Sequence, residues 1–178
     1  MLSETLLMGR YFELAGKPAV LLTAFIATVI LLAVFPAIPV GGELLDVRNG
    51  YGHEEALAAL AGYGAEGRHL YAWASATLDT LLPVAYATLL AGIAYRFRPT
   101  ERLRVLAWLP VALGVLDLGE NAQVITMLLQ YPDVSEAQVA SASAFTVTKT
   151  FAFVACFGYA LVLVVLAVVR RLLARRSA

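Results

Sequence analysis

The sequence predicts an all-α integral membrane protein: a four-transmembrane-helix bundle with a short interfacial helix in the first outer loop. Of its 178 residues, 61% are hydrophobic and 15% are charged, and the mean hydropathy of +0.78 is far above that of a water-soluble domain. The apolar residues form four long runs, each long enough to cross the ~30 Å hydrocarbon core of a bilayer. We expect a single domain over residues 1–178.

The first two spans are expected over residues 18–36 and 70–95. The apolar part of the first exceeds the about 7 to 15 residues of a signal peptide, so we interpret it as a retained helix. The second carries one charged residue, Asp79. Pro83 leaves a backbone carbonyl near Asp79 without its helical hydrogen bond, which indicates either a kink that exposes a polar site or ordinary packing.

The third and fourth spans are expected over residues 105–131 and 139–169. The third carries Asp117 and Glu120, and the fourth carries only Lys149. The fourth is long enough to tilt or to begin with an interfacial turn. All four spans therefore remain apolar apart from a few charged residues near their middles.

The connection over residues 41–69 is the only long loop, and its residues 53–61 are typical of a short helix that Gly62, Gly64 and Gly67 then end. We expect this helix to lie on the outer membrane surface, either as a lid over the bundle or as a plain structured connector. A similar interfacial helix is expected on the inner side within the first seventeen residues.

The orientation follows from the basic residues, which are retained on the cytoplasmic side. Ten of the 13 lie at span ends that share one face: Arg10, Lys17, Arg96, Arg98, Arg102, Arg104, Arg170, Arg171, Arg175 and Arg176. The other face carries two basic residues and seven acids: Arg48, Arg68, Glu43, Asp46, Glu54, Glu55, Glu66, Asp133 and Glu136. Both termini are therefore expected in the cytoplasm, in a membrane of the bacterial inner type.

Composition also limits the function classes. The single cysteine, Cys156, excludes an internal disulfide and a cysteine metal cluster, and we interpret it as a packing residue. His53 and His69 lie outside or at the rim of the spans, which disfavours a haem within the bundle. The net charge is zero, so no nucleic-acid partner is expected. We expect no cofactor and no metal site, and we interpret the acids of the long loop, Asp46 included, as solvated.

Four ionisable residues inside the spans need an explanation, because each costs about 2.5 to 3.5 kcal/mol on insertion scales. Asp117, Glu120 and Asn121 share one helix face through their i, i+3 and i+4 spacing. Comparable polar faces are Ser75, Asp79 and Tyr86 on the second span, and Thr146, Lys149 and Thr150 on the fourth. We expect these faces to point inward and to meet at one level, with Lys149 paired to one or two carboxylates.

Two readings of this cluster stay open. The functional one is a small membrane enzyme or ligand-binding site that works on a lipid-like or isoprenoid molecule by acid–base chemistry. Its candidate catalytic residues are Asp79, Asp117, Glu120 and Lys149, and its candidate substrate-binding residues are Asn121, Tyr86, Thr146, Ser75 and Arg68. The structural reading is a polar network that only stabilises the bundle of an accessory subunit in a membrane complex.

A third hypothesis is a proton-coupled carrier that acts as a dimer, since intramembrane carboxylates serve as proton relays. Four helices without an inverted repeat disfavour it for a monomer. The expected partners are membrane lipids and a hydrophobic small molecule in the bundle, and both homo- and hetero-oligomers stay open. Arg68, His69, Tyr71 and Trp73 are typical of an interfacial belt, and Arg68 is also placed to guard the mouth of a cavity.

Overall fold

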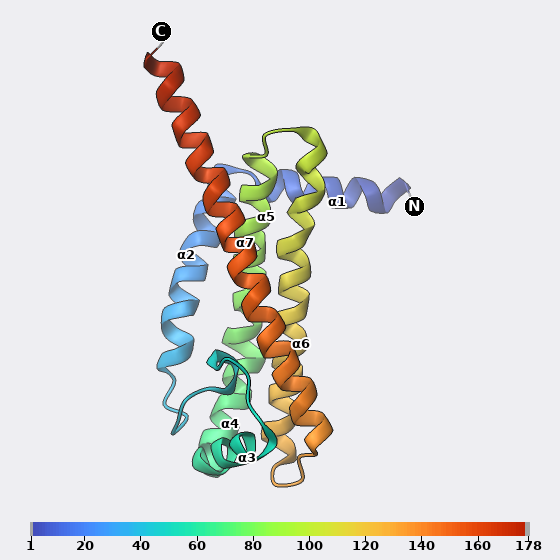
Figure 1. Ribbon diagram of the computed structural model, residues 1–178, viewed down its shortest axis with the longest axis vertical. Coiled ribbons are helices and arrows are strands. Elements are labelled where there is room, and N and C mark those ends of the chain that lie inside the picture. Colours follow the sequence, from blue (N-terminus) through green and yellow to red (C-terminus); the bar gives the residue numbers. More distant parts are fainter. Residues whose placement is uncertain (1, 177–178) are drawn as a thin grey trace.

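The computed structural model describes residues 2–176, which are almost entirely helical and contain no strand. Four long segments run side by side in Figure 1: α2 (Pro18–Val34), α4 (Gly64–Ala74) continuing into α5 (Thr80–Arg96), α6 (Trp108–Gln130) and α7 (Glu136–Arg176). Three described helical stretches are long and apolar enough to cross a membrane: Pro18–Ala37, Gly64–Arg96 and Glu136–Arg176. The 23-residue α6, which carries Asp117 and Glu120 near its middle, is not among them.

The second long helix begins earlier than the sequence predicted. It starts at Gly64 rather than at residue 70, and Gly67 lies inside α4 instead of ending a helix. The reason is packing: a Cβ at Gly67 would lie 2.2 Å from the carbonyl oxygen of Val40. Gly67 therefore lets the loop backbone lie against the helix, a close approach that only glycine permits.

The remaining boundaries differ by a few residues. A 3₁₀ helix, Glu101–Ala107, precedes α6, so the third segment begins with a tighter turn than expected. The helix α7 starts at Glu136 and continues to Arg176, beyond the predicted end at residue 169. Helix ends carry polar and basic residues that hydropathy alone does not assign to a helix.

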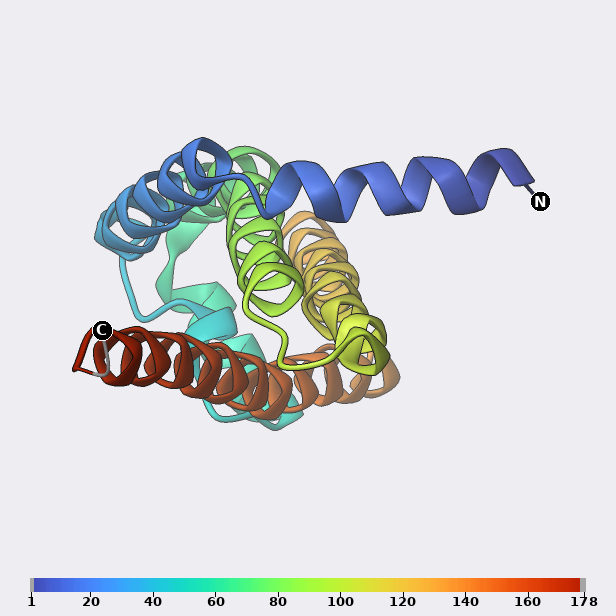
Figure 2. The same cartoon turned by 90° about the horizontal axis from the view of Figure 1, so that it is seen from above.

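The first helix, α1 (Leu2–Ala15), lies across one end of the bundle (Figures 1 and 2). The α5–α6 connection and the end of α7 lie at this same end, whereas α3 (His53–Gly62) and the α6–α7 turn lie at the other. The end of α1 lies close to α5, because Gly92 of α5 has no side chain. Arg96 of α5 also donates a hydrogen bond of 2.9 Å to the carbonyl oxygen of Gly16, directly after α1.

Replacing Gly92 with alanine is expected to destabilise the fold by about 1 to 3 kcal/mol, the usual range for overpacking. The new Cβ would lie 2.3 Å from the carbonyl oxygen of Ala15, so either α1 or α5 must shift. Thermal unfolding in detergent measures the effect. The matched control is Gly158→Ala, because a Cβ there meets nothing within 4 Å. Equal unfolding temperatures for the two variants would contradict the close crossing.

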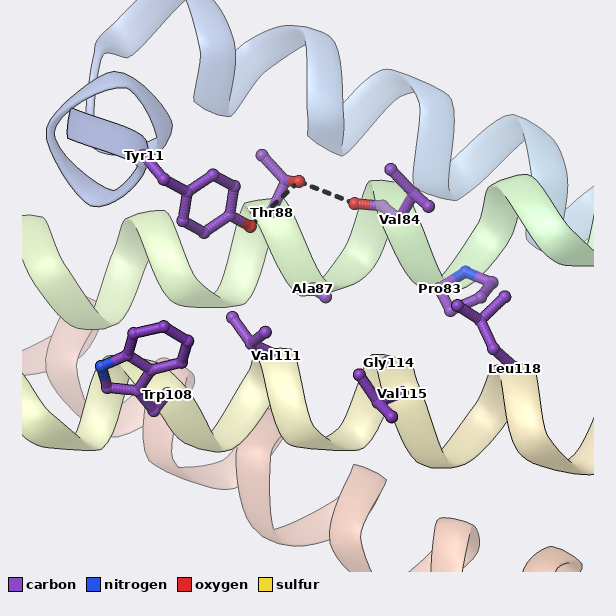
Figure 3. Close-up of a pocket in the computed structure, with 10 residues that line it drawn as sticks. All are labelled: Tyr11, Pro83, Val84, Ala87, Thr88, Trp108, Val111, Gly114, Val115 and Leu118. Carbon is purple, nitrogen blue, oxygen red and sulfur yellow. Dashed lines mark hydrogen bonds between the residues drawn. The ribbon is translucent and has the colours of Figure 1, made fainter. Parts of the chain in front are cut away.

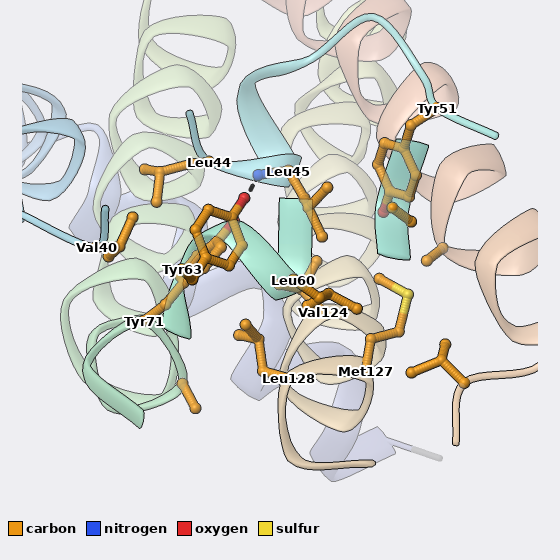
Figure 4. Close-up of a cluster of buried hydrophobic side chains, with 14 of the residues drawn as sticks. Val40, Leu44, Leu45, Tyr51, Leu60, Tyr63, Tyr71, Val124, Met127 and Leu128 are labelled. Atoms are coloured by element: carbon orange, nitrogen blue, oxygen red, sulfur yellow. Dashed lines mark hydrogen bonds between the residues drawn. The ribbon is translucent and has the colours of Figure 1, made fainter. Parts of the chain in front are cut away.

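The end of the bundle opposite α1 has its own hydrophobic core (Figure 4). Tyr71, Leu60 and Met127, from three different helices, are completely buried there. The loop between α2 and α3 packs on this core through Leu45, and Tyr51 donates its backbone N–H to the Ser143 hydroxyl of α7 at 2.9 Å. The loop is therefore folded into the bundle instead of lying over it.

Candidate functional site

Lys149 of α7 stands at the centre of the polar cluster. Its ammonium nitrogen lies 3.3 Å from Asp117 Oδ1, contacts Glu120 Oε2, and donates a hydrogen bond of 3.5 Å to the backbone carbonyl of Asp46. An ammonium group has three N–H donors, and here it has three acceptors. The acids of α6 and the lysine of α7 thus meet, as their helical spacing indicated.

Glu120 is the most enclosed member of the cluster. It is completely buried, its Oε1 accepts a hydrogen bond from the Thr146 hydroxyl, and its Oε2 faces Lys149. Asp117, one turn away on α6, accepts a hydrogen bond of 2.7 Å from the Tyr86 hydroxyl of α5. Both carboxylates of α6 therefore have partners from neighbouring helices.

Asp79 differs from these two acids because it forms no ion pair with Lys149 or with any other described residue. Its Oδ2 has no hydrogen-bond partner, although the residue is only 3% exposed. It ends a π-helical turn, Ser75–Asp79, which separates α4 from α5. Pro83, inside the first turn of α5, cannot donate a hydrogen bond to the carbonyl of Asp79. The wider turn lies where the sequence indicated a proline-related distortion, and such turns are frequent at functional sites.

Asp46 also belongs to the cluster, which sequence analysis missed by assigning it to a solvated acidic loop. It is 8% exposed and lies in the 3₁₀ turn Leu45–Val47, and its Oδ1 accepts a hydrogen bond of 2.8 Å from the Tyr71 hydroxyl. Burial raises the pKa of Asp46 above its usual value of 3.8, and the charge of Lys149 opposes this shift.

Tyr71 holds the loop in place. Its hydroxyl donates to Asp46 and accepts the backbone N–H of Leu45 at 3.0 Å. Sequence analysis assigned Tyr71 to an interfacial belt, but it is completely buried, whereas Trp73 is 59% exposed. The signal that could have revealed Asp46 is its position after Leu44 and Leu45, two apolar residues that anchor this part of the loop in the core.

Replacing Tyr71 with phenylalanine is expected to cost about 1 to 3 kcal/mol, because Asp46 and the Leu45 N–H lose a buried partner. Hydrogen exchange should then be faster at residues 44–47 than in the unaltered protein. Tyr159→Phe is the control, since the Tyr159 hydroxyl has no hydrogen-bond partner. Unchanged exchange in the loop would show that Tyr71 does not anchor it.

A cavity of about 340 Å³ opens beside the cluster. Its polar wall contains Asp46, Asp79, Asp117 and Lys149, and Lys149 is the only basic residue that lines it. The other lining residues come from the end of α2, the following loop, α5 and α7: Leu32, Phe35, Pro36, Val47, Asn49, Leu82, Tyr86, Thr150, Phe153 and Val154. A polar end wall with mainly apolar side walls is typical of a small-molecule site.

A second cavity of about 300 Å³ adjoins the first, because Leu32 lines both. It lies between α2, α5 and α7, and its lining contains no charged residue. Phe153 of the first cavity and Phe157 of the second have ring centroids 4.6 Å apart. Together the two cavities extend from the polar cluster along α2 and α7 as an apolar groove. Figure 2 shows the bundle from the end at which α1 lies.

Of the nine candidate site residues, five line the first cavity or bond directly to a residue that does: Asp79, Asp117, Lys149, Tyr86 and Glu120. Thr146 does not line the cavity, but its hydroxyl donates a hydrogen bond to Glu120. Asn121 and Ser75 are buried with side-chain atoms that lack hydrogen-bond partners, but neither lines the cavity. Arg68 is placed elsewhere: it donates to the Leu60 carbonyl at 3.0 Å and covers the Tyr131 ring.

A cavity of about 470 Å³ is separate from the cluster (Figure 3). It lies between α1, α5 and α6, and none of its lining residues is charged. Within residues 9–176, no group of three His, Cys, Asp or Glu side chains is arranged to hold a metal ion. The cavity beside Lys149 therefore has charged lining residues, which the cavity in Figure 3 does not have.

Comparisons of this chain with models of protein families, with curated proteins and with solved structures find no match.

Proposed function

We propose that the protein is an integral membrane protein of the bacterial inner-membrane type, with four spans and both termini in the cytoplasm. Three helices have the length and apolar character of spans, and α6 packs between α5 and α7. The basic residues that flank α2, α5, α6 and α7 gather at the end of the bundle where α1 lies. This asymmetry supports the cytoplasmic position of that end.

The proposed topology can be tested by cysteine labelling, because the chain has one native cysteine, Cys156, which is buried. In a Cys156→Ala background, a membrane-impermeant maleimide should label Asp133→Cys from outside intact cells. Arg102→Cys should react only after the membrane is opened. Labelling of Arg102→Cys in intact cells would overturn the proposed orientation.

We propose further that the cavity beside Lys149 binds an amphiphile, a lipid-like or isoprenoid molecule, and carries out acid–base chemistry on its polar end. The observation that carries this proposal is the cavity itself, which places three carboxyl groups and one ammonium group at the end of an apolar groove. Such a shape accommodates a molecule with one polar end and one hydrocarbon chain.

The contacts support different proposed roles for three of the four candidate catalytic residues. Asp79, with a free Oδ2 at the cavity wall, is the candidate general acid or base. Asp117 is oriented by Tyr86 and Lys149 and stabilises positive charge that develops on the substrate. Glu120 does not line the cavity, so it acts as a positioning residue for Lys149.

A structural role for part of the cluster is favoured by one observation: Thr146 and Lys149 of α7 both contact Glu120 of α6 directly. Such a network fixes the register of α6 against α7 without any ligand. In that case the protein is an accessory subunit, and the cavity holds only bulk lipid. The two proposals differ in whether one amphiphile is retained selectively.

Extraction in a mild detergent followed by mass spectrometry of retained lipids tests the binding proposal. We expect one amphiphile to be enriched over the bulk lipids. Val154→Trp, which places a large ring at the cavity mouth, should remove this enrichment. The matched control is Val165→Trp, an exposed position on the same helix that lines none of the cavities described above. Bulk-like lipid in the unaltered protein would overturn the proposal.

A further inference from the structure

The charge balance of the cavity indicates which polar end it takes. Lys149 is the only basic residue that lines it, and its ammonium group already has Glu120, Asp117 and the Asp46 carbonyl as partners. Two carboxylates therefore already compensate the charge of Lys149, the one cation among the described residues that line the cavity. A phosphate or carboxylate entering the cavity would find no cation that is free to bind it.

The acids, by contrast, are in excess. Asp46 and Asp79 both line the cavity, and neither forms an ion pair in the described residues. Asp79 is 97% buried, lines the cavity, and has an Oδ2 without a hydrogen-bond partner. Two neighbouring carboxyl groups in a poorly solvated place repel each other when both are ionised, and a cation between them relieves this repulsion.

We infer that the site takes an amphiphile whose polar end is an amine in its ammonium form, and that it rejects an amphiphile with an anionic end. This inference rests on the proposed function and names its substrate class. The ammonium group of the ligand donates a hydrogen bond to the unpartnered Oδ2 of Asp79 and lies beside the carboxyl group of Asp46. Charge-assisted hydrogen bonds of this kind are the strongest that a small polar group forms.

The rest of the molecule follows the apolar groove. Beyond the acids, Leu32 and Phe153 lead into the second cavity, where Phe25 and Leu161 form the walls. Leu32 and Phe25 are about two helical turns apart on α2. A single unbranched hydrocarbon chain fits this path, and its burial supplies affinity while the amine supplies selectivity.

Three probes with the same chain test the inference: dodecylamine, dodecanol and dodecyl phosphate. Each is titrated against the full-length protein in one maltoside detergent, and the unfolding temperature is followed. Dodecylamine should bind about 10- to 100-fold more tightly than dodecanol, the range for a hydrogen bond to a charged group, and dodecyl phosphate should bind most weakly. Asp79→Asn should remove the preference for the amine, whereas Asp133→Asn, at an exposed acid in the α6–α7 turn, should keep it.

Val154→Trp tests whether the cavity binds an amphiphile at all, whereas the comparison of the three probes tests which polar end it prefers. The inference is overturned if dodecyl phosphate or dodecanol binds as tightly as dodecylamine, or if Asp79→Asn keeps the preference. The proposed amphiphile site still stands in that case, provided that Val154→Trp weakens every probe and Val165→Trp does not. If no probe binds, or if Val154→Trp changes nothing, both the site and its substrate class are overturned.

Discussion

Replacing Lys149 with methionine is expected to lower the free energy of unfolding by about 3 to 5 kcal/mol. The methionine fills a similar volume but removes the positive charge that faces Glu120 and Asp117. Glu120 is completely buried, so its carboxylate cannot recover hydration. Removing one partner of a buried ion pair therefore leaves an uncompensated charge, which is the costly outcome. Denaturant unfolding in mixed micelles measures the loss.

The double variant Lys149→Met with Glu120→Gln provides the control. Its glutamine is neutral and can still accept the Thr146 hydrogen bond, so we expect most of the stability to return. Because the two residues are in contact, the double-mutant cycle should give a coupling energy well above the error of additivity, which is about 0.3 to 0.5 kcal/mol. Additive effects would show that Lys149 and Glu120 do not interact in the folded protein.

Under the proposed acid–base function, replacing Asp79 with asparagine is expected to slow turnover strongly while leaving the fold intact. A general acid or base contributes about 10²- to 10⁴-fold to a rate, so the loss in kcat should fall in that range. Stability should stay equal or rise, since the free Oδ2 of Asp79 contributes no hydrogen bond and its charge lies near three other acids. Incubation of the purified variant with a membrane lipid extract, analysed by mass spectrometry, measures the loss of turnover. Thermal unfolding measures the stability.

The two variants differ in their expected effect on stability, and this difference distinguishes the hypotheses. Under acid–base catalysis, Asp79→Asn removes activity at full stability, whereas Lys149→Met lowers both. Asp79→Asn that unfolds the protein would indicate that the acid holds α5 in place. An unchanged lipid composition after deletion of the gene would count against catalysis and leave the accessory-subunit hypothesis as the stronger one.

Much of the helical architecture follows from local physics. Long apolar runs separated by short basic or acidic connections predict helices of membrane-spanning length, and the structure contains helical segments close to all four predicted ranges. The meeting of Asp117, Glu120 and Lys149 could also be predicted. Polar residues spaced at three and four positions share a helix face, and a face that carries charge turns away from lipid.

The errors have one cause in common, which is contact between segments distant in sequence. Gly67 was predicted to end a helix, yet it lies inside α4 and lets the backbone of Val40 pack closely against that helix. Arg68 was assigned to the site because it lies near the expected outer end of the second span. Its guanidinium instead donates a hydrogen bond to the Leu60 carbonyl and lies over the Tyr131 ring. In both cases the residue type allowed two environments, and only the packing selects between them.

The sequence by itself determined that the chain forms apolar helices with a few charged residues on inward faces, because hydropathy and helical periodicity are local properties. Only the tertiary structure decided what surrounds those charges. Asp46 reaches Lys149 across 103 residues of chain through a loop whose path depends on Tyr71 and the core beneath it. That path gives Lys149 its contact with the Asp46 carbonyl and brings the Asp46 carboxyl group to the cavity, on which the proposed preference for a cationic ligand depends.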